Sequence, residues 1–293
     1  MDSRAENLRN AFTVDVEDYF QVSAFEQDVA RKRWPDFESR VEANTLCIAD
    51  MLDVAGVRAT FFVLGWVGDR YPKLIRELHR RGHEIGSHSY WHRLIYSQKP
   101  AEFREDLKRS RDVLQDNIGV AVTSYRAPSF SITERSLWAL EVLVEEGFRI
   151  DSSIFPVYHD RYGIAGARPD IHVLETSSGS LTEFPPSVAR LALLNLPVSG
   201  GGYFRLYPFA VTRFFLSRIN GRQRHPFMFY IHPWEVDPEQ PRLSITSRMA
   251  RMRHYVNLAT TQKKLTALLK QFSFGCMDEV VAGQINGGGD ALG

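Results

Sequence analysis

Two histidines four residues apart are the strongest sign of chemistry in the chain. His88 and His92 enclose the tripeptide Ser-Tyr-Trp and come shortly after a predicted short strand, residues 83–86. If the segment is helical, side chains at this spacing lie on one face, so both imidazoles can reach one cation. The pair therefore indicates a metal site. With nine histidines in the chain, some close pair is also expected by chance, so further ligands are needed.

Three carboxylates end an apolar segment near the start of the chain. The segment, residues 11–16, reads as a buried strand, and the carboxylates belong to Asp15, Glu17 and Asp18. Such groups repel one another unless a positive charge lies among them. One carboxylate can complete a His-His-carboxylate set on a divalent metal, while another stays free as a general base. A solvated turn, in which Asp18 caps a helix, is the alternative interpretation.

Three more polar residues follow predicted strands. Arg126 precedes a Pro turn and is suited to orienting a carboxylate through a two-pronged hydrogen bond. Asp151 follows the strand 148–150, and His232 follows the strand 226–231. We predict that Asp151 accepts a hydrogen bond from one ring nitrogen of His232, so that the oriented imidazole can act as a general acid. Taken singly, Arg126 reads as a surface residue and His232 as a structural histidine.

Strands and helices alternate over more than two hundred residues. This alternation predicts a parallel sheet with helices outside it. Since the polar clusters follow strands directly, they should meet at the carboxyl edge of a closed or nearly closed barrel, where such folds assemble one site. The predicted strands are 11–16, 59–64, 83–86, 120–125, 148–150 and 226–231, with short strands also expected at 172–176 and 182–184. The predicted helices are 38–55, 72–81, 100–117, 133–146, 208–219 and 261–272.

The order of these motifs resembles that of the polysaccharide deacetylases, the NodB-homology enzymes of carbohydrate esterase family 4. The similarity runs from about residue 11 to about residue 235 and includes Thr-Val-Asp-Val-Glu-Asp at 13–18, the histidine pair, Arg-Ala-Pro at 126–128, the aspartate at 151 and Ile-His at 231–232. The resemblance implies an α/β fold, a distorted barrel of the (β/α)7 type. It also implies that Asp15 is the base and that a following carboxylate binds the metal.

The first motif departs from the family's commoner form, in which two aspartates are adjacent. Here Val16 and Glu17 separate Asp15 from Asp18. Because side chains alternate along a strand, Asp15 and Glu17 should point the same way. Glu17 is then the ligand if the strand persists, and Asp18 is the ligand if the strand bulges. We favour Glu17 slightly.

Three longer phrases are similar to one branch of the family, which is associated with exopolysaccharide biosynthesis and exosortase gene clusters. They are DVEDYFQVSAFE, GGGYFRLYP and FYIHPWEVDPEQP. The branch carries a short C-terminal extension, so we expect a deacetylase domain at 1–235, an extension packed on the barrel at 236–280, and a disordered tail at 281–293. Residues 200–205 are expected to form a mobile loop.

The resemblance implies removal of N-acetyl groups from amino sugars of a polysaccharide or its precursor. Zinc is the default metal, and iron, cobalt, nickel or manganese could use the same ligands. The implied ligands are His88, His92 and Glu17 or Asp18, and the implied catalytic residues are Asp15, Arg126, Asp151 and His232. We predict substrate contacts for Tyr125, Trp91, Tyr203, Phe204 and Trp234. Rival hypotheses are an allantoinase-like hydrolase of cyclic amides or ureides and an inactive barrel that binds glycan.

Composition limits the expected binding partners and the expected cellular location of the protein. A formal net charge of +1 and a pI near 7.8 provide no global field that would attract nucleic acid or an anionic membrane. The two cysteines, Cys47 and Cys276, lie far apart and predict no disulfide framework. A polar start at 1–12 and the lack of a long apolar run predict neither a signal peptide nor a spanning helix. We expect a cytoplasmic protein, located at the inner membrane face if its glycan is lipid-linked. The oligomeric state does not follow from the sequence.

Overall fold

A computed structural model describes residues 8–159, 162–191 and 194–288 of the chain. Its main sheet has seven parallel strands in the spatial order β10, β1, β2, β3, β4, β5 and β7. Spatial order therefore follows chain order except at β10, which returns beside β1. The strands are Met228–Ile231 (β10), Asn10–Val16 (β1), Thr60–Val63 (β2), Glu84–Ser87 (β3), Ser124–Tyr125 (β4), Ile150–Asp151 (β5) and Gly179–Glu183 (β7).

The ring of strands does not close. β6 (His172–Thr176) pairs antiparallel with β7 and ends the sheet on that side, and no ladder joins it to β10 within the described residues. β11 (Phe274–Gly275) pairs with the first residues of β1, while β8 (Val188–Leu191) and β9 (Leu194–Pro197) form a separate hairpin. The fold is the expected α/β architecture, a distorted, open barrel.

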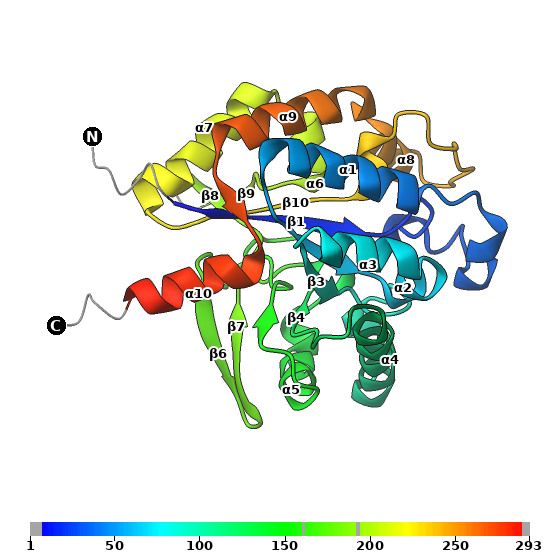
Figure 1. The fold of residues 1–293 in the computed structure, drawn as a ribbon, viewed down its shortest axis with the longest axis horizontal. Helices are drawn as coiled ribbons and strands as arrows, with labels where there is room; N and C mark the ends of the chain where they lie inside the picture. Colours follow the sequence, from blue (N-terminus) through cyan, green and yellow to red (C-terminus); the bar gives the residue numbers. More distant parts are fainter. Residues whose placement is uncertain (1–7, 160–161, 192–193, 289–293) are drawn as a thin grey trace.

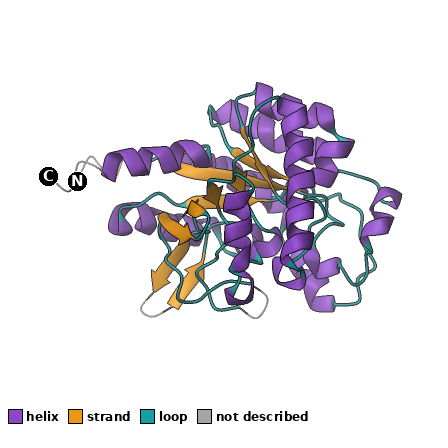
Figure 2. Ribbon diagram, turned by 90° about the horizontal axis from the view of Figure 1, so that it is seen from below, coloured by secondary structure: helices purple, strands orange, loops and turns teal. Residues whose placement is uncertain are grey.

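Helices form an outer layer around the strands (Figures 1 and 2). Their ends follow the local sequence signals: α1 stops at Gly56, whose φ of 65° only glycine adopts easily, and α4 starts at Pro100. The helices are α1 (Val41–Ala55), α2 (Gly65–Arg70), α3 (Pro72–Arg80), α4 (Pro100–Ile118), α5 (Trp138–Glu145), α6 (Gly201–Leu206), α7 (Phe209–Arg218), α8 (Arg248–Tyr255), α9 (Thr261–Gln271) and α10 (Met277–Gly288). No helix in the described ranges combines the length and apolar character needed to cross a membrane.

The register of the strands brings the predicted polar residues to one edge. Val16 pairs with Val63, Val63 with Ser87, and Ser87 with Tyr125. The chain therefore leaves β1, β3 and β4 at neighbouring points, and Glu17, His88 and Arg126 come next in sequence. β10 reaches the same edge, because Val14 pairs with Ile231, the residue before His232. Parallel pairing thus collects residues from distant parts of the chain into one place.

The glycine-rich segment forms ordered structure, so the expectation of a mobile loop at 200–205 is wrong. Gly200 makes a parallel bridge with Tyr230, and residues 201–206 form α6. A Cβ at Gly200 would lie 1.9 Å from the carbonyl oxygen of Tyr230, so only glycine allows this close approach.

The C-terminal region packs into the same body. β11 joins the main sheet, and the buried side chains of Leu265 and Leu268 on α9 belong to the main core. The chain continues as α10 to Gly288, so the expected disordered tail is wrong for residues 281–288. Residues 289–293 of that predicted tail, and residues 1–7 of the polar N-terminal stretch, lie outside the described residues.

Candidate functional site

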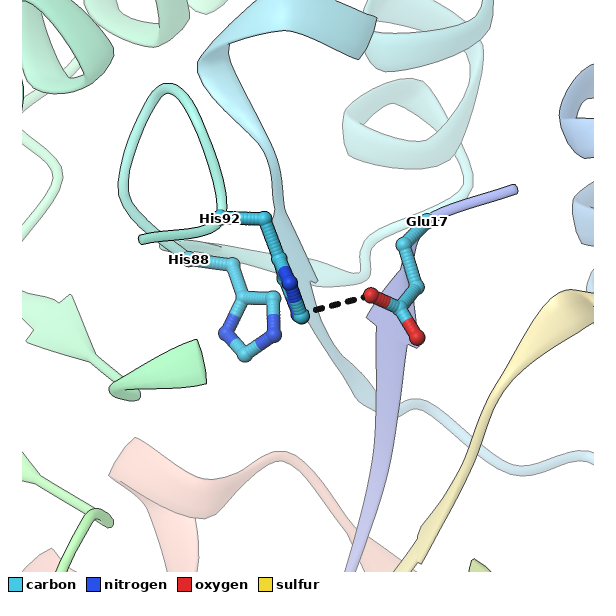
Figure 3. Close-up of side chains that lie close together, drawn as sticks. All are labelled: Glu17, His88 and His92. Atoms are coloured by element: carbon cyan, nitrogen blue, oxygen red, sulfur yellow. Dashed lines mark ion pairs between the residues drawn. The ribbon is translucent and has the colours of Figure 1, made fainter. Parts of the chain in front are cut away.

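Three buried side chains converge at the carboxyl edge of the sheet. Possible ligand atoms of Glu17, His88 and His92 lie within 4.8 Å of one another. Figure 3 shows the three side chains pointing toward a common centre, with 2.7 Å between Glu17 Oε2 and His92 Nε2. The segment between the histidines is not helical, so the helical argument for their convergence is wrong. Instead, Ser89 and His92 have φ values of 64° and 52°, and the loop folds the two rings together.

Hydrogen bonds orient both rings. His88 Nδ1 lies 2.8 Å from the carbonyl oxygen of Arg126, and because a carbonyl only accepts, Nδ1 carries the proton. His88 Nε2 therefore keeps its lone pair. His92 Nδ1 is 3.3 Å from Ser23 Oγ, which leaves its Nε2 facing Glu17. Burial lowers the pKa of His88 to about 4, so the ring is neutral near pH 7, as a metal ligand must be.

The carboxylate of Glu17 completes a set that fits a divalent cation. Burial would raise its pKa, but the neighbouring imidazoles outweigh burial and lower the pKa to about 2, so the group is ionised. Oε2 is buried and makes no hydrogen bond, despite its short distance to His92. One carboxylate oxygen and two imidazole nitrogens form a ligand set that zinc and similar transition metals prefer.

Asp18 does not belong to this set, so the prediction that it could be the carboxylate ligand is wrong. Its Oδ2 accepts hydrogen bonds from Ser39 Oγ at 2.7 Å and from the backbone N–H groups of Arg40 at 2.9 Å and Val41 at 3.2 Å. The carboxylate therefore faces the start of α1. The alternative interpretation of Asp18, that it caps a helix, describes this geometry.

Asp15 forms a buried ion pair with Arg126. Arg126 Nη1 donates to Asp15 Oδ1 at 2.6 Å and to Thr13 Oγ1 at 2.8 Å, and its guanidinium lies 4.2 Å from the ring centroid of Phe62. Neither residue of the pair is more than 2% exposed. The other oxygen, Asp15 Oδ2, lies 3.9 Å from His232 Nε2. The guanidinium thus stabilises the ionised carboxylate and aims it at the centre of the site.

His232 is held by Glu235, so the prediction that Asp151 holds it is wrong. Glu235 Oε1 lies 2.8 Å from His232 Nδ1, and Nε2 faces Glu17 Oε1 at 3.7 Å. Although burial alone would lower it, the hydrogen bond to Glu235 and the nearby carboxylates raise the pKa of His232 to about 9. The spacing of Glu235, three residues after His232, was the available sequence signal for this contact, which the sequence analysis missed.

Asp151 belongs to a different contact. Its Oδ1 accepts a hydrogen bond from Ser153 Oγ at 2.5 Å, and the residue pairs directly with Glu183 across β5 and β7. Asp151 Oδ2 and Glu183 Oε2 are buried and make no other hydrogen bond, and burial raises the pKa of both groups. A proton on one carboxyl lets it donate to the other, so we expect the pair to share one proton. Asp151 is therefore occupied by Ser153 and Glu183.

Of the five predicted substrate contacts, only Tyr203 lines the pocket beside the site. This pocket, about 520 Å³, also includes Ser23, which contacts His92, and Tyr230. A larger hollow of about 820 Å³ lies at the opposite end of β1, beside Asn10.

The other four aromatic side chains lie elsewhere. The predictions for Tyr125 and Phe204 are wrong, because both side chains are fully buried in the core. Trp234 is stacked between the rings of His232 and His254, and Trp91 packs against Trp34.

Two family models match the chain in adjacent segments. Residues 34–145 match "Polysaccharide deacetylase", and residues 152–282 match "Domain of unknown function (DUF3473)". The second segment runs across the boundary expected at 235. Among curated relatives, a peptidoglycan-N-acetylglucosamine deacetylase of Bacillus cereus is 33% identical over 95 residues, and the Bacillus subtilis protein YheN, assigned as a polysaccharide deacetylase, is 27% identical over 180 residues.

These alignments cover 32% and 57% of this chain, and the chain spans 34% and 63% of the lengths of the two relatives. Two solved structures share the fold. One is a Mycobacterium smegmatis protein assigned as a polysaccharide deacetylase, with a TM-score of 0.58, 21% identity, and coverage of 95% of this chain and 90% of that one. The other, Puue allantoinase, has a TM-score of 0.61, 13% identity and the same coverage. The matched model and relatives thus make residues 34–145 of the chain similar to the polysaccharide deacetylase family.

Proposed function

We propose that the protein is a metal-dependent hydrolase that removes N-acetyl groups from amino sugars of a polysaccharide or its precursor. One observation carries the proposal: Glu17, His88 and His92 converge, with Asp15 and His232 beside them. A cation bound by the three ligands would supply Lewis-acid polarisation of the amide carbonyl and of a water molecule. The related deacetylases support the choice of an acetylated amino sugar as substrate.

In the proposed reaction, Asp15 accepts one proton and His232 donates another. Asp15, kept ionised by Arg126, accepts a proton as the water oxygen bonds to the acetyl carbon. His232 faces the same centre through Nε2 and donates a proton to the sugar nitrogen as the carbon–nitrogen bond breaks. Acetate and a free amine leave. The two groups approach within 3.9 Å of each other, so both can reach one scissile amide.

The test is acetate release from N-acetylglucosamine oligomers by the purified protein, together with metal content by mass spectrometry. We expect about one metal ion per chain, loss of activity with a chelator, and recovery with zinc. Glu17→Gln and His88→Ala should lose metal and activity together. His79→Ala, on the outer helix α3, removes an imidazole far from these ligands and should change neither. Activity that survives chelation and His88→Ala would overturn the metal scheme.

The finer assignments belong to the same proposal. Zinc is our first choice of metal, because two imidazoles and one carboxylate form a frequent zinc site with open positions. We place the substrate in exopolysaccharide synthesis, from the branch-like phrases in the sequence, as a free or lipid-linked chain. Parallel assays with allantoin and with free and lipid-linked acetylated oligosaccharides distinguish these substrates.

A further inference from the structure

A buried chain of contacts leads from His232 to the C-terminal region. Glu235 Oε1 accepts from His232 Nδ1 at 2.8 Å, and Glu235 Oε2 accepts from Arg205 Nε at 2.6 Å. Arg205 Nη1 in turn donates to the backbone carbonyls of His254 at 2.7 Å and Val256 at 2.9 Å. Arg205 is 2% exposed and Glu235 is fully buried. Two of the branch-like phrases thus meet, since Arg205 lies in GGGYFRLYP and Glu235 in FYIHPWEVDPEQP.

Arg205 also supports the His232 ring indirectly, through Trp234, which stacks on the face of the imidazole. Its guanidinium lies 5.2 Å from the ring centroid of Trp234. Trp234 stacks on His232 at 5.1 Å, and its indole N–H donates to Glu17 Oε1 at 3.3 Å. The position of the His232 ring is therefore fixed both in its plane, by Glu235, and across its face, by Trp234.

A buried ion pair such as Arg205–Glu235 is a poor way to gain stability, because desolvation of two charges offsets their attraction. Its placement is better explained by the imidazole it holds. An acceptor at Nδ1 selects the tautomer and orientation in which Nε2 faces the reacting groups. Nε2 of His232 indeed faces Asp15 and Glu17.

We propose that Glu235 is the positioning residue of His232 and that Arg205, anchored on the carbonyls of residues 254 and 256, holds Glu235 in place. The inference rests on the proposed function for its effect on catalysis. It makes the region beyond β10 part of the machinery of proton donation. The region matched by the model of unknown function, residues 152–282, contains Arg205, His232, Glu235 and both carbonyls.

A simpler role for Glu235 has to be separated from this one. Its Oε1 also accepts from the backbone N–H of His232 at 3.0 Å, as the cap of the short helix Pro233–Val236. Glu235→Gln keeps an oxygen for that cap and keeps the size of the side chain, but removes the charge that pairs with Arg205 and the imidazole. A capping role alone predicts little change, and a positioning role predicts a loss.

The first experiment compares kcat and KM for Glu235→Gln, Glu235→Ala and Arg205→Lys in the full-length, metal-loaded protein. We expect kcat to fall by at least about 10-fold in each, most in Glu235→Ala, while KM and metal content stay near wild type. Glu183→Gln is the matched control, because it makes the same substitution at another buried glutamate of the barrel and should keep kcat. Wild-type kcat in Glu235→Gln and Glu235→Ala would overturn the proposal.

The second experiment does not depend on activity. NMR of 15N-histidine-labelled protein should show a slowly exchanging Nδ1-bound proton on His232, assigned by its absence in His232→Gln. We expect this signal in wild type and Glu183→Gln, faster exchange in Glu235→Gln, and loss in Glu235→Ala, with melting curves confirming the fold. An unchanged signal in Glu235→Ala would refute the positioning role. If wild type shows the signal but releases no acetate, the proposed function fails while the positioning contact stands.

Discussion

Two aspartates at the same edge of the barrel have opposite surroundings. Asp15 lies at the end of β1 and Asp151 at the end of β5, and both are almost completely buried. Asp15 faces the guanidinium of Arg126 at 2.6 Å. Asp151 faces a second carboxyl, Glu183, which lies directly opposite it in the neighbouring strand. Burial penalises an ionised carboxylate in both places, but of the two aspartates only Asp15 forms a direct ion pair with the guanidinium of Arg126.

The difference decides which aspartate can accept a proton. The ion pair with Arg126 gives Asp15 the surroundings that its proposed role as base requires. Beside another carboxyl, Asp151 is expected to share one proton with Glu183: burial raises the pKa of both groups, and Asp151 raises that of Glu183 further. A buried aspartate at a strand end is thus a candidate base only where the fold places a positively charged side chain beside it.

The sharpest test applies one substitution to both aspartates. We expect Asp15→Asn to reduce kcat by about 10²–10⁴-fold, because the amide cannot accept the proton of the attacking water. Asp151→Asn should keep kcat within about 3-fold of wild type, since it has no contact with the reacting groups and no role in general acid–base catalysis. Acetate release is measured below the melting temperature of each variant.

Measuring the metal content of Asp15→Asn and Asp151→Asn shows whether a loss of activity comes from loss of the catalytic base or from loss of the bound metal. Both variants should bind one metal ion per chain, because Glu17, His88 and His92 are intact. Equal losses of kcat in the two variants would contradict the comparison, and a selective loss in Asp151→Asn would restore the original assignment of Asp151.

The second test removes the compensating cation. Arg126→Met should destabilise the fold by about 3–5 kcal/mol, because it leaves the Asp15 carboxylate buried without its partner. Chemical denaturation measures the change. Arg104→Met is the control: Arg104 pairs with Glu146 at 2.7 Å but is 38% exposed, so the stability should change little. Equal unfolding free energies for wild type and Arg126→Met would show that Asp15 does not need the guanidinium.

The sequence predicts the strands and the edge at which the polar residues gather, but not the individual contacts between them. The alternation of strands and helices predicted the sheet, because buried parallel strands such as β2 and β10 are nearly continuous apolar runs. Strand ends then predicted that Glu17, His88 and His232 would lie at one edge. Which carboxylate oxygen faces which imidazole nitrogen depends on loop geometry, such as the positive φ of Ser89 and His92. The spacing of residues in the sequence does not predict that geometry.

Apart from the contact between His232 and Glu235, the missed contacts were between residues far apart in the chain. Arg205 reaches Glu235 across 30 positions, and Asp151 meets Glu183 across 32. The sequence placed Asp151 at a strand end correctly and indicated a short strand at 182–184, but it held no signal that this strand, part of β7, pairs with β5. The aromatic predictions for Tyr125 and Phe204 failed for a related reason, because an aromatic near a motif packs into the core as readily as it lines a pocket.

The shared proton of the carboxyl pair predicts a pH effect of intermediate size. Burial raises the pKa of Asp151 to about 6 and that of Glu183 well above its ordinary value, so the folded state binds more protons than the unfolded chain. This contribution to stability is complete below about pH 4, and it is lost as the pH rises through the folded values. Wild type should therefore lose stability relative to Glu183→Gln between about pH 4 and pH 8, by on the order of 1 kcal/mol or more.

Denaturant titrations of both proteins at several pH values measure this difference. Because other groups titrate equally in the two proteins, subtraction isolates the carboxyl pair. Parallel curves for wild type and Glu183→Gln would mean that the two carboxyls do not share a proton.

The smallest expected effect concerns Asp18, a third buried carboxylate, which contacts neutral donors in place of a cation. It accepts from one hydroxyl and from the backbone N–H groups of Tyr19, Arg40 and Val41. These donors do not fully offset burial, which raises the pKa of Asp18 to about 6. Asn keeps an acceptor oxygen for some of these bonds, so Asp18→Asn should cost about 1 kcal/mol of stability. Metal content should stay at one ion per chain, whereas Glu17→Gln loses it. Loss of metal in Asp18→Asn would make Asp18 a ligand after all, and with it the carboxylate geometry around His88 and His92 would have to change on metal binding.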